Sequence, residues 1–151
     1  MSKCHYSTTV CLGLIFLLLG CGKSTLATYP VSGEVVLEDG STLRNGGKVV
    51  FQQLDSDSPL TATGYFGEDG KYSLTTFDKD DGAPAGEYVV MVVPTIPDDT
   101  DGLSARERRE VRNPIDSKFK NSKSSGLHFT VSPDTSPHEF RIEVTRPRIR
   151  R

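Results

Sequence analysis

Apolar and polar residues alternate along most of the chain in short runs, and glycine, proline or aspartate closes each run. A period of two is typical of β-strands that have one face in a core. We therefore predict seven strands, at residues 30–38, 47–53, 61–66, 71–76, 86–94, 126–132 and 137–144. The run at 86–94 is almost continuously apolar, which predicts a central strand that is covered on both faces for part of its length. In the last two strands we expect one alternate set to face inward: Leu127, Phe129, Val131, Phe140, Ile142 and Val144.

Turn signals separate these strands. Asp39-Gly40 and Asp69-Gly70 are tight-turn pairs, and the second lies between two alternating runs, which predicts a hairpin joining 61–66 to 71–76. We expect a bulge or a close backbone approach at Gly33, and Tyr88 with its ring packed inward and its hydroxyl at the rim. The fold class predicted is all-β, a seven-stranded antiparallel β-sandwich.

One segment, residues 98–125, lacks a strand pattern and is highly charged. Ser104 and Glu107 have the spacing of a capping box, which leaves a single short helix possible. The absence of further periodicity favours a long, mobile loop. We therefore expect one long charged loop on the sandwich.

The stretch LLLGCGKST at residues 17–25 has two interpretations. A phosphate-binding P-loop requires glycine at position 17, where Leu17 stands, and a helix directly after it, whereas strand-like sequence follows. The alternative is an export signal, because Lys3 precedes an apolar run at 10–19 that is too short to span a bilayer. The sequence therefore favours export over nucleotide binding.

The end of that run, Leu18-Leu19-Gly20-Cys21, resembles the bacterial lipobox. This resemblance implies diacylglycerol on Cys21, cleavage before it and acylation of the new amino group. The alternative is an ordinary cleaved signal peptide with a chance cysteine. Gly22 stands where an aspartate would retain a lipoprotein in the inner membrane, which favours the outer membrane. We expect a protein anchored by its N-terminal lipid in the cell envelope, at the outer membrane or the periplasmic face.

The predicted organisation follows from this cleavage. Residues 1–20 are a lipoprotein signal peptide, 21–29 the lipidated cysteine and a polar tether, 30–145 the β-sandwich domain, and 146–151 a basic tail. The other two cysteines, Cys4 and Cys11, lie in the segment that is removed. The mature domain is thus expected to have no internal disulfide and no zinc-binding cysteine pair.

The strand motifs occur in a characteristic order: Val31-Ser32-Gly33-Glu34-Val35, Asp39-Gly40, Val49-x-Phe51, Asp69-Gly70-Lys71-Tyr72 and Gly82-Ala83-Pro84-Ala85-Gly86-Glu87-Tyr88. Over residues 30–145 this order resembles the carboxypeptidase-regulatory-like, or transthyretin-like, β-sandwich. The resemblance is closest to small lipoproteins with this domain from planctomycete-type bacteria. In the carboxypeptidases the module contributes no catalytic residue, so the resemblance implies no peptidase activity.

Candidate catalytic groups are few. A hydrolase relative of this fold uses histidines, an arginine and a C-terminal Tyr-Arg-Gly-Ser, whereas this chain ends Arg146-Pro147-Arg148-Ile149-Arg150-Arg151. His128 and His138 lie in strand-like runs where we expect them to face solvent, and neither has a carboxylate at motif spacing. We therefore predict no catalytic and no cofactor-binding residue; lipidation of Cys21 is the one predicted site.

Two acidic loops, at 78–82 and 98–102, contain half of the pattern of a calcium-binding loop. Neither continues to the glutamate that closes such a loop. No metal-binding residue is predicted, and calcium-supported adhesion or carbohydrate binding remains an alternative function.

The mature chain is acidic up to Asp101 and basic from Gly102 onward. The basic tail could contact anionic lipid head groups or polysaccharide, fold back on the acidic half, or be solvated. A nucleic-acid partner is not expected, because no aromatic platform accompanies the arginines. The predicted function is a lipid-anchored, non-enzymatic envelope module that is structural or binds a protein or polysaccharide. The alternatives are the calcium-supported domain and a transthyretin-like hydrolase.

Overall fold

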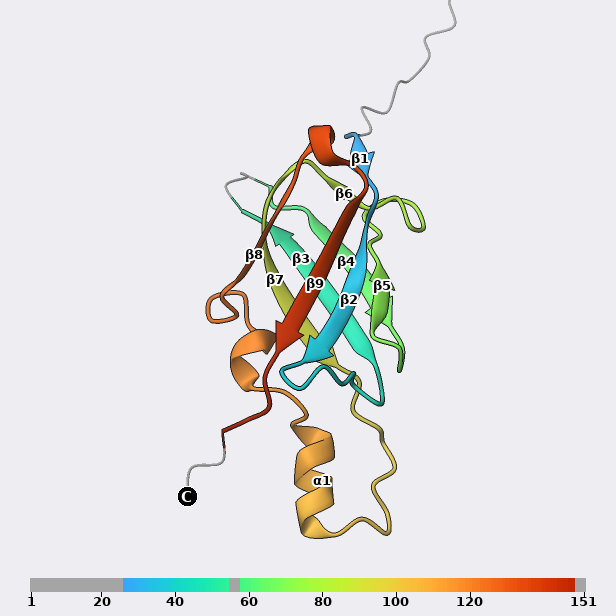
Figure 1. Cartoon of the computed structure of the whole chain (residues 1–151), viewed down its shortest axis with the longest axis vertical. Coiled ribbons are helices and arrows are strands. Elements are labelled where there is room, and N and C mark those ends of the chain that lie inside the picture. The colour runs from blue at the N-terminus through green and yellow to red at the C-terminus, as the bar shows by residue number, and fades with distance from the viewer. Residues whose placement is uncertain (1–25, 55–57, 149–151) are drawn as a thin grey trace, which may run out of the picture.

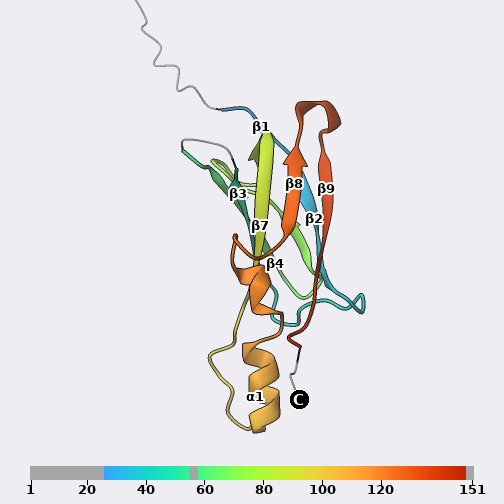
Figure 2. The same cartoon turned by 90° about the vertical axis from the view of Figure 1, so that its left-hand side faces the viewer.

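The computed structural model of the chain describes residues 26–54 and 58–148 (Figure 1). Cys21, the signal peptide and most of the predicted tether lie outside the described residues. Two β-sheets pack face to face, which confirms the all-β sandwich (Figure 2). The strands of the described part are β1 (Thr28–Tyr29), β2 (Val31–Leu37), β3 (Gly47–Gln53), β4 (Thr61–Phe66), β5 (Lys71–Ser73), β6 (Ala83–Pro84), β7 (Gly86–Pro94), β8 (Leu127–Val131) and β9 (His138–Val144).

One sheet has the order β5-β2-β9 and the other β4-β3-β7-β8. A strand lies in each of the seven predicted ranges, and the sequence did not predict the two-residue strands β1 and β6, which pair with each other. Strand β7 is internal in its sheet, and Tyr88, Val89 and Val90 are buried in succession along it. The prediction of a central strand covered on both faces is therefore confirmed.

The core lies between the sheets and is centred on the Phe51 ring. Four other aromatic rings surround it at centroid distances of 5.9–6.3 Å: Tyr72, Tyr88, Phe129 and Phe140. These are separations at which aromatic pairs attract one another beyond their burial of apolar area. Of the residues predicted to face inward, Val131, Ile142 and Val144 are buried, whereas Leu127, Phe129 and Phe140 are half-buried along the seam between β8 and β9.

The prediction that all pairs are antiparallel is wrong for β2 and β9, which run parallel from Val31 opposite His138 to Leu37 opposite Val144. Alternation along a strand predicts which face is buried but contains no information about the direction of its neighbour. A parallel pair requires a long connection, and here nearly the whole domain lies between the two strands.

The predicted hairpin between 61–66 and 71–76 is correct at its turn and at one antiparallel bridge, between Thr63 and Thr75. The Gly70 N–H donates to the Gly67 carbonyl at 3.1 Å, and Gly70 has φ +73°. Beyond the turn β4 joins one sheet and β5 the other, and only the bridge between Thr63 and Thr75 links them. The turn is therefore a corner between the two sheets.

Strand β5 pairs with β2 instead, and Gly33 makes this possible. Tyr72 and Phe140 are both in register with Gly33, one on each side. The Tyr72 hydroxyl donates to the Phe140 carbonyl at 3.1 Å, so the tyrosine side chain crosses β2 where that strand has no side chain. A Cβ on Gly33 would lie 1.9 Å from the Phe140 oxygen, which confirms the predicted close backbone approach.

Residues 98–125 are not the structureless loop that we expected. They contain α1 (Ala105–Arg112) and the 3₁₀-helix η1 (Ser117–Lys120). The capping box is formed, with Ser104 N–H donating to Glu107 and Glu107 N–H donating to the Ser104 hydroxyl. The loop prediction failed because Ile115 and Phe119, single apolar residues without a periodic pattern, are both buried and attach the segment to the core.

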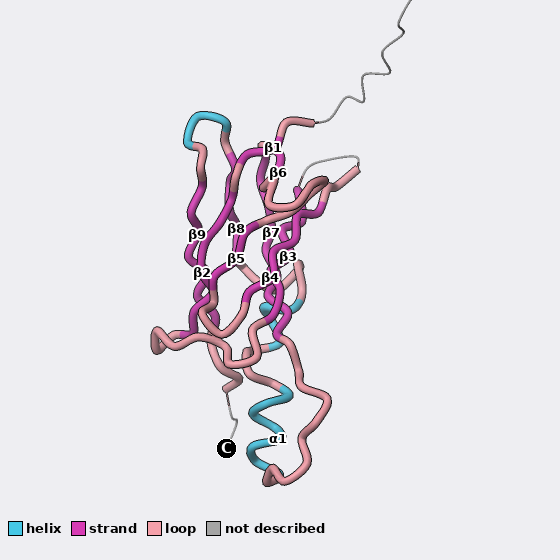
Figure 3. The backbone as a smooth tube through the Cα atoms, turned by 90° about the vertical axis from the view of Figure 1, so that its right-hand side faces the viewer, coloured by secondary structure: helices cyan, strands magenta, loops and turns pink. Residues whose placement is uncertain are grey.

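The two ends of the sandwich carry different features. Strand β1, which occupies the last two residues of the predicted tether, lies at one end, and α1 and the described part of the C-terminal tail lie at the other (Figures 1 and 3). The described residues contain no helix that is long and apolar enough to cross a membrane. We call the end that carries α1 the distal end.

Candidate functional site

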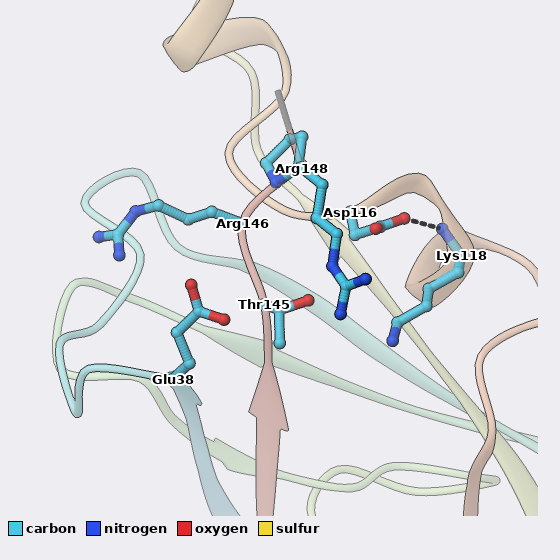
Figure 4. Close-up of a pocket in the computed structure, with 7 residues that line it drawn as sticks. Glu38, Asp116, Lys118, Thr145, Arg146 and Arg148 are labelled. Carbon is cyan, nitrogen blue, oxygen red and sulfur yellow. Dashed lines mark hydrogen bonds between the residues drawn. The ribbon is translucent and has the colours of Figure 1, made fainter. Parts of the chain in front are cut away.

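A cavity of ≈ 570 Å³ opens at the distal end, where β2 and β9 finish (Figure 4). Three segments far apart in the sequence line it: the residue after β2, the start of η1 and the four residues after β9. The lining residues are Glu38, Asp116, Lys118, Thr145, Arg146, Pro147 and Arg148. We call this cavity the distal cleft.

Main-chain hydrogen bonds hold the three segments together. The Asp116 N–H donates to the Thr145 carbonyl at 2.8 Å, and the Glu38 N–H donates to the Val144 carbonyl at 3.0 Å. Asp116 also caps η1, since its Oδ1 accepts the Lys118 N–H at 3.0 Å. Because the walls of the distal cleft are fixed in this way, a ligand would bind to a largely pre-formed site.

Arg146 connects the tail to the turn after β2. Its Nη1 lies 2.7 Å from Asp39 Oδ2, and its Nη2 donates to the Ser41 hydroxyl at 3.4 Å. Hydrogen bonds from Ser41, together with Arg146, hold the pKa of Asp39 well below its usual range, so the carboxylate stays charged. Of the three roles considered for the basic tail, folding back on the acidic half is confirmed for Arg146.

Lys118 and Arg148 differ from Arg146, because neither has an ion-pair partner among the described residues. The Lys118 Nζ lies 4.6 Å from the centroid of the Phe119 ring. In Figure 4 the ammonium of Lys118 and the guanidinium of Arg148 point toward the same space, and Thr145 lies between them and Glu38. Two cations next to a hydroxyl form a donor set that suits an anion.

The two histidines are not brought together. His128 is exposed on β8, as predicted, whereas the prediction for His138 is wrong because its side chain is only 7% exposed. The His138 Nε2 accepts the Ser132 N–H at 3.0 Å and lies 2.8 Å from the main-chain carbonyl oxygen of Ser132. The sequence contained the signal, since His138 shares the inward parity of Phe140 and Ile142. Tyr88 also departs from expectation, because its hydroxyl is buried and donates to the Pro84 carbonyl at 2.8 Å.

In the acidic loop at 78–82, the carboxylate of Asp81 has a structural role. Asp81 accepts the N–H groups of Thr76, Phe77 and Asp78 at 2.7, 3.0 and 3.1 Å. Burial acts to raise the pKa of Asp81, but these donors together outweigh it and lower the pKa. Within residues 26–54 and 58–148, no three His, Cys, Asp or Glu side chains are grouped so that they could hold a metal ion. The calcium alternative thus gains no ligand set there.

No protein-family model matches the chain, and neither does any curated protein. Among solved structures, a crystal structure of a 9R-lipoxygenase from Cyanothece PCC8801 is similar with a TM-score of 0.38 and 12% sequence identity. The similarity covers 80% of this chain but only 17% of the lipoxygenase chain. At that TM-score it supports no inference about function.

Sequence reasoning missed the distal cleft. It identified the arginines of the tail but not Lys118 or Asp116 as their neighbours. The contact that joins the two segments runs between main-chain atoms, Asp116 N–H and Thr145 O, and therefore leaves no signal in residue type. The predicted lipidation residue, Cys21, lies outside the part of the chain that the structure describes.

Proposed function

We propose that the protein is a lipid-anchored, non-enzymatic β-sandwich of the cell envelope that binds a negatively charged envelope polymer with its distal end. We further propose that the sandwich has the transthyretin-like topology that the sequence motifs resemble. The observation that carries the functional proposal is that β1 lies at one end of the domain, whereas β2 and β9 finish at the other, where the distal cleft is (Figure 1). A lipid on Cys21 would tether the domain at the β1 end.

Chain dimensions support a role away from the anchoring leaflet. The seven residue-to-residue steps from Cys21 to Thr28 can span at most about 25 Å. Strand β9 has seven residues, which corresponds to about 23 Å, so the distal end lies one strand length beyond the attachment point. This geometry favours a partner that lies away from the membrane. It disfavours, as partners, the head groups of the lipid leaflet that holds the anchor.

The surface of α1 supports a binding role. None of its residues is buried, and only Val111 is even partly covered. Arg106 and Glu110 form an i,i+4 ion pair, whereas the side chains of Arg109 and Arg112 have no ion-pair partner in the described part. A helix that is polar on all sides does not stabilise a core, and short helices are marginal in water without packing. We therefore assign α1 to contacts with an acidic partner.

The anchor is tested in the native cells. We expect the wild-type chain to incorporate a labelled fatty acid and to sediment with membranes, and the Cys21→Ala variant to do neither. The control is a Cys4→Ala variant, because Cys4 lies in the predicted signal peptide and its loss should change nothing. Recovery of unlabelled wild-type protein that keeps its first twenty residues would exclude the anchor.

The binding role is tested with phosphocellulose, an anionic polysaccharide matrix, and unmodified cellulose as the neutral matrix. The full chain in non-ionic detergent should be retained on phosphocellulose only, with less retention as salt rises. Arg109→Glu should weaken retention, whereas Lys79→Glu, an exposed change in the 78–82 loop away from the distal end, should not. Equal effects of the two changes would contradict a distal binding surface. Deletion of 98–125 is unsuitable because it removes the buried Ile115 and Phe119.

A further inference from the structure

We propose that the distal cleft is a binding site for a single phosphate group, which Lys118 and Arg148 hold from two sides. This inference rests on the proposed binding role of the distal end and specifies the chemical group that is recognised. The first observation is the convergence of the two cationic groups on one space within a cavity of ≈ 570 Å³ (Figure 4). That volume lies in the range typical of small-ligand sites.

Lys118 and Arg148 are the cations of the cleft without an ion-pair partner among the described residues, and the Glu38 carboxylate that also lines it lies on the other side of Thr145 (Figure 4). Arg146 is neutralised by Asp39, which lies 2.7 Å away. The Asp116 carboxylate is directed to the N–H of Lys118 as the cap of η1, and no described carboxylate lies within ion-pair distance of Lys118 or Arg148. Two like charges that face one space repel each other, and a bound anion removes this repulsion and adds two charge-assisted hydrogen-bond donors.

The geometry of the donors favours phosphate over a carboxylate. The guanidinium of Arg148 is a planar fork that can bind two oxygens, and the ammonium of Lys118 approaches from a different segment. Thr145, whose hydroxyl can donate a third hydrogen bond, lies beside them. Three donor side chains on two segments can engage three oxygens of a tetrahedral anion, whereas a carboxylate offers only two.

The main-chain segments that carry Lys118 and Arg148 are held in place before a ligand arrives. The stem of Lys118 starts on η1, which Asp116 caps and which the buried Phe119 attaches to the core. The tail that carries Arg148 is held two and three residues earlier, by the Arg146–Asp39 pair and by the Asp116 N–H on the Thr145 carbonyl. The ordering required on binding is thus confined to the exposed side chains of Lys118 and Arg148.

The test is calorimetric titration of the full chain, in non-ionic detergent at constant ionic strength, with inorganic phosphate. We expect saturable binding of phosphate and at least tenfold weaker binding of acetate. Lys118→Gln and Arg148→Gln should each weaken phosphate binding about tenfold, the effect typical of losing one charge-assisted contact. The control is Lys79→Gln, which removes an exposed cation outside the cleft and should change the affinity less than twofold.

Three results would overturn the proposal: no phosphate binding by the wild-type chain, acetate binding as tightly as phosphate, or equal losses in the Lys79 and Arg148 variants. Unchanged melting temperatures of the variants show that a loss is not due to unfolding, and Lys118→Arg should retain binding. Vesicles of phosphatidylglycerol should fail to displace inorganic phosphate if the source is a soluble phosphate ester, and should displace it if the source is a lipid head group. Because this titration does not depend on lipidation, its failure is distinguishable from failure of the Cys21 labelling.

Discussion

Replacing Gly33 with alanine tests whether a single missing side chain holds the three-stranded sheet together. The added Cβ would lie 1.9 Å from the Phe140 carbonyl oxygen and 2.7 Å from the carbonyl carbon. Both atoms belong to the backbone of β9 and cannot rotate away as a flexible side chain would. The shorter distance is about 1.5 Å below the 3.4 Å at which ordinary van der Waals contact begins, so β2 and β9 must separate at this point.

The energetic effect follows from the bonds that separation breaks. The Phe140 carbonyl also accepts the Tyr72 hydroxyl, so the same movement affects this hydrogen bond and the adjacent rungs of the parallel ladder. Each hydrogen bond contributes about 1 kcal/mol, and three of them give about 3 kcal/mol. Alanine lowers the entropy of the unfolded chain and offsets about 0.5–1 kcal/mol of this. We expect Gly33→Ala to reduce the free energy of unfolding by about 2–2.5 kcal/mol.

Urea unfolding followed by circular dichroism measures this loss, with the wild-type slope as a check that the transition stays two-state. The control is Gly67→Ala, because Gly67 does not have a positive φ and the nearest atom to its added Cβ, Asp69 Oδ1, lies at 3.8 Å. That change should leave the stability unaltered or raise it slightly. Tyr72→Phe should remove only the hydroxyl contact, about 1 kcal/mol. If Gly33→Ala proved as mild as Gly67→Ala, the close-approach argument would be refuted.

Two further predictions concern buried or bonded acids. Burial raises the pKa of Tyr88 to about 12, so its contribution to stability is complete below the unfolded value of about 10 and is lost as the pH rises through 12. Burial also raises the pKa of Tyr72, so ultraviolet titration should show one late phenolate fewer in Tyr88→Phe than in the wild type. Asp81→Ala should lower stability by about 1–2 kcal/mol at neutral pH, because three N–H groups lose their acceptor. Since the pKa of Asp81 is lowered in the folded state, the difference in stability between Asp81→Ala and the wild type should shrink as the pH falls below about 4. A difference in stability that does not change with pH would contradict this explanation. Asp78→Ala, which keeps the backbone that Asp81 bonds, is the control.

The strands were predictable because the signals for them are local. Strand β7 begins and ends at the predicted Gly86 and Pro94, since the apolar run and its flanking residues are adjacent in the sequence. The pairing of the strands was harder to predict from the sequence. Alternation predicted the inward face of β9 but not that β9 runs parallel to β2, and the Asp69-Gly70 turn did not show that β5 leaves the hairpin to pair with β2. Local patterns specify faces and turns, whereas partners depend on contacts between distant segments.

Helix α1 and the distal cleft illustrate the same distinction for the functional end of the molecule. The capping box of α1 involves Ser104 and Glu107, three residues apart, and the sequence contained it. The cleft depends on Asp116 meeting Thr145 through main-chain atoms, which no residue pattern reports. For this reason a count of charges in the tail treats its arginines alike. The structure separates them, because the ion pair with Asp39 neutralises Arg146 and leaves Arg148, two residues later, with its charge available to a ligand. Which cation can bind is therefore decided by the neighbours that folding gives it.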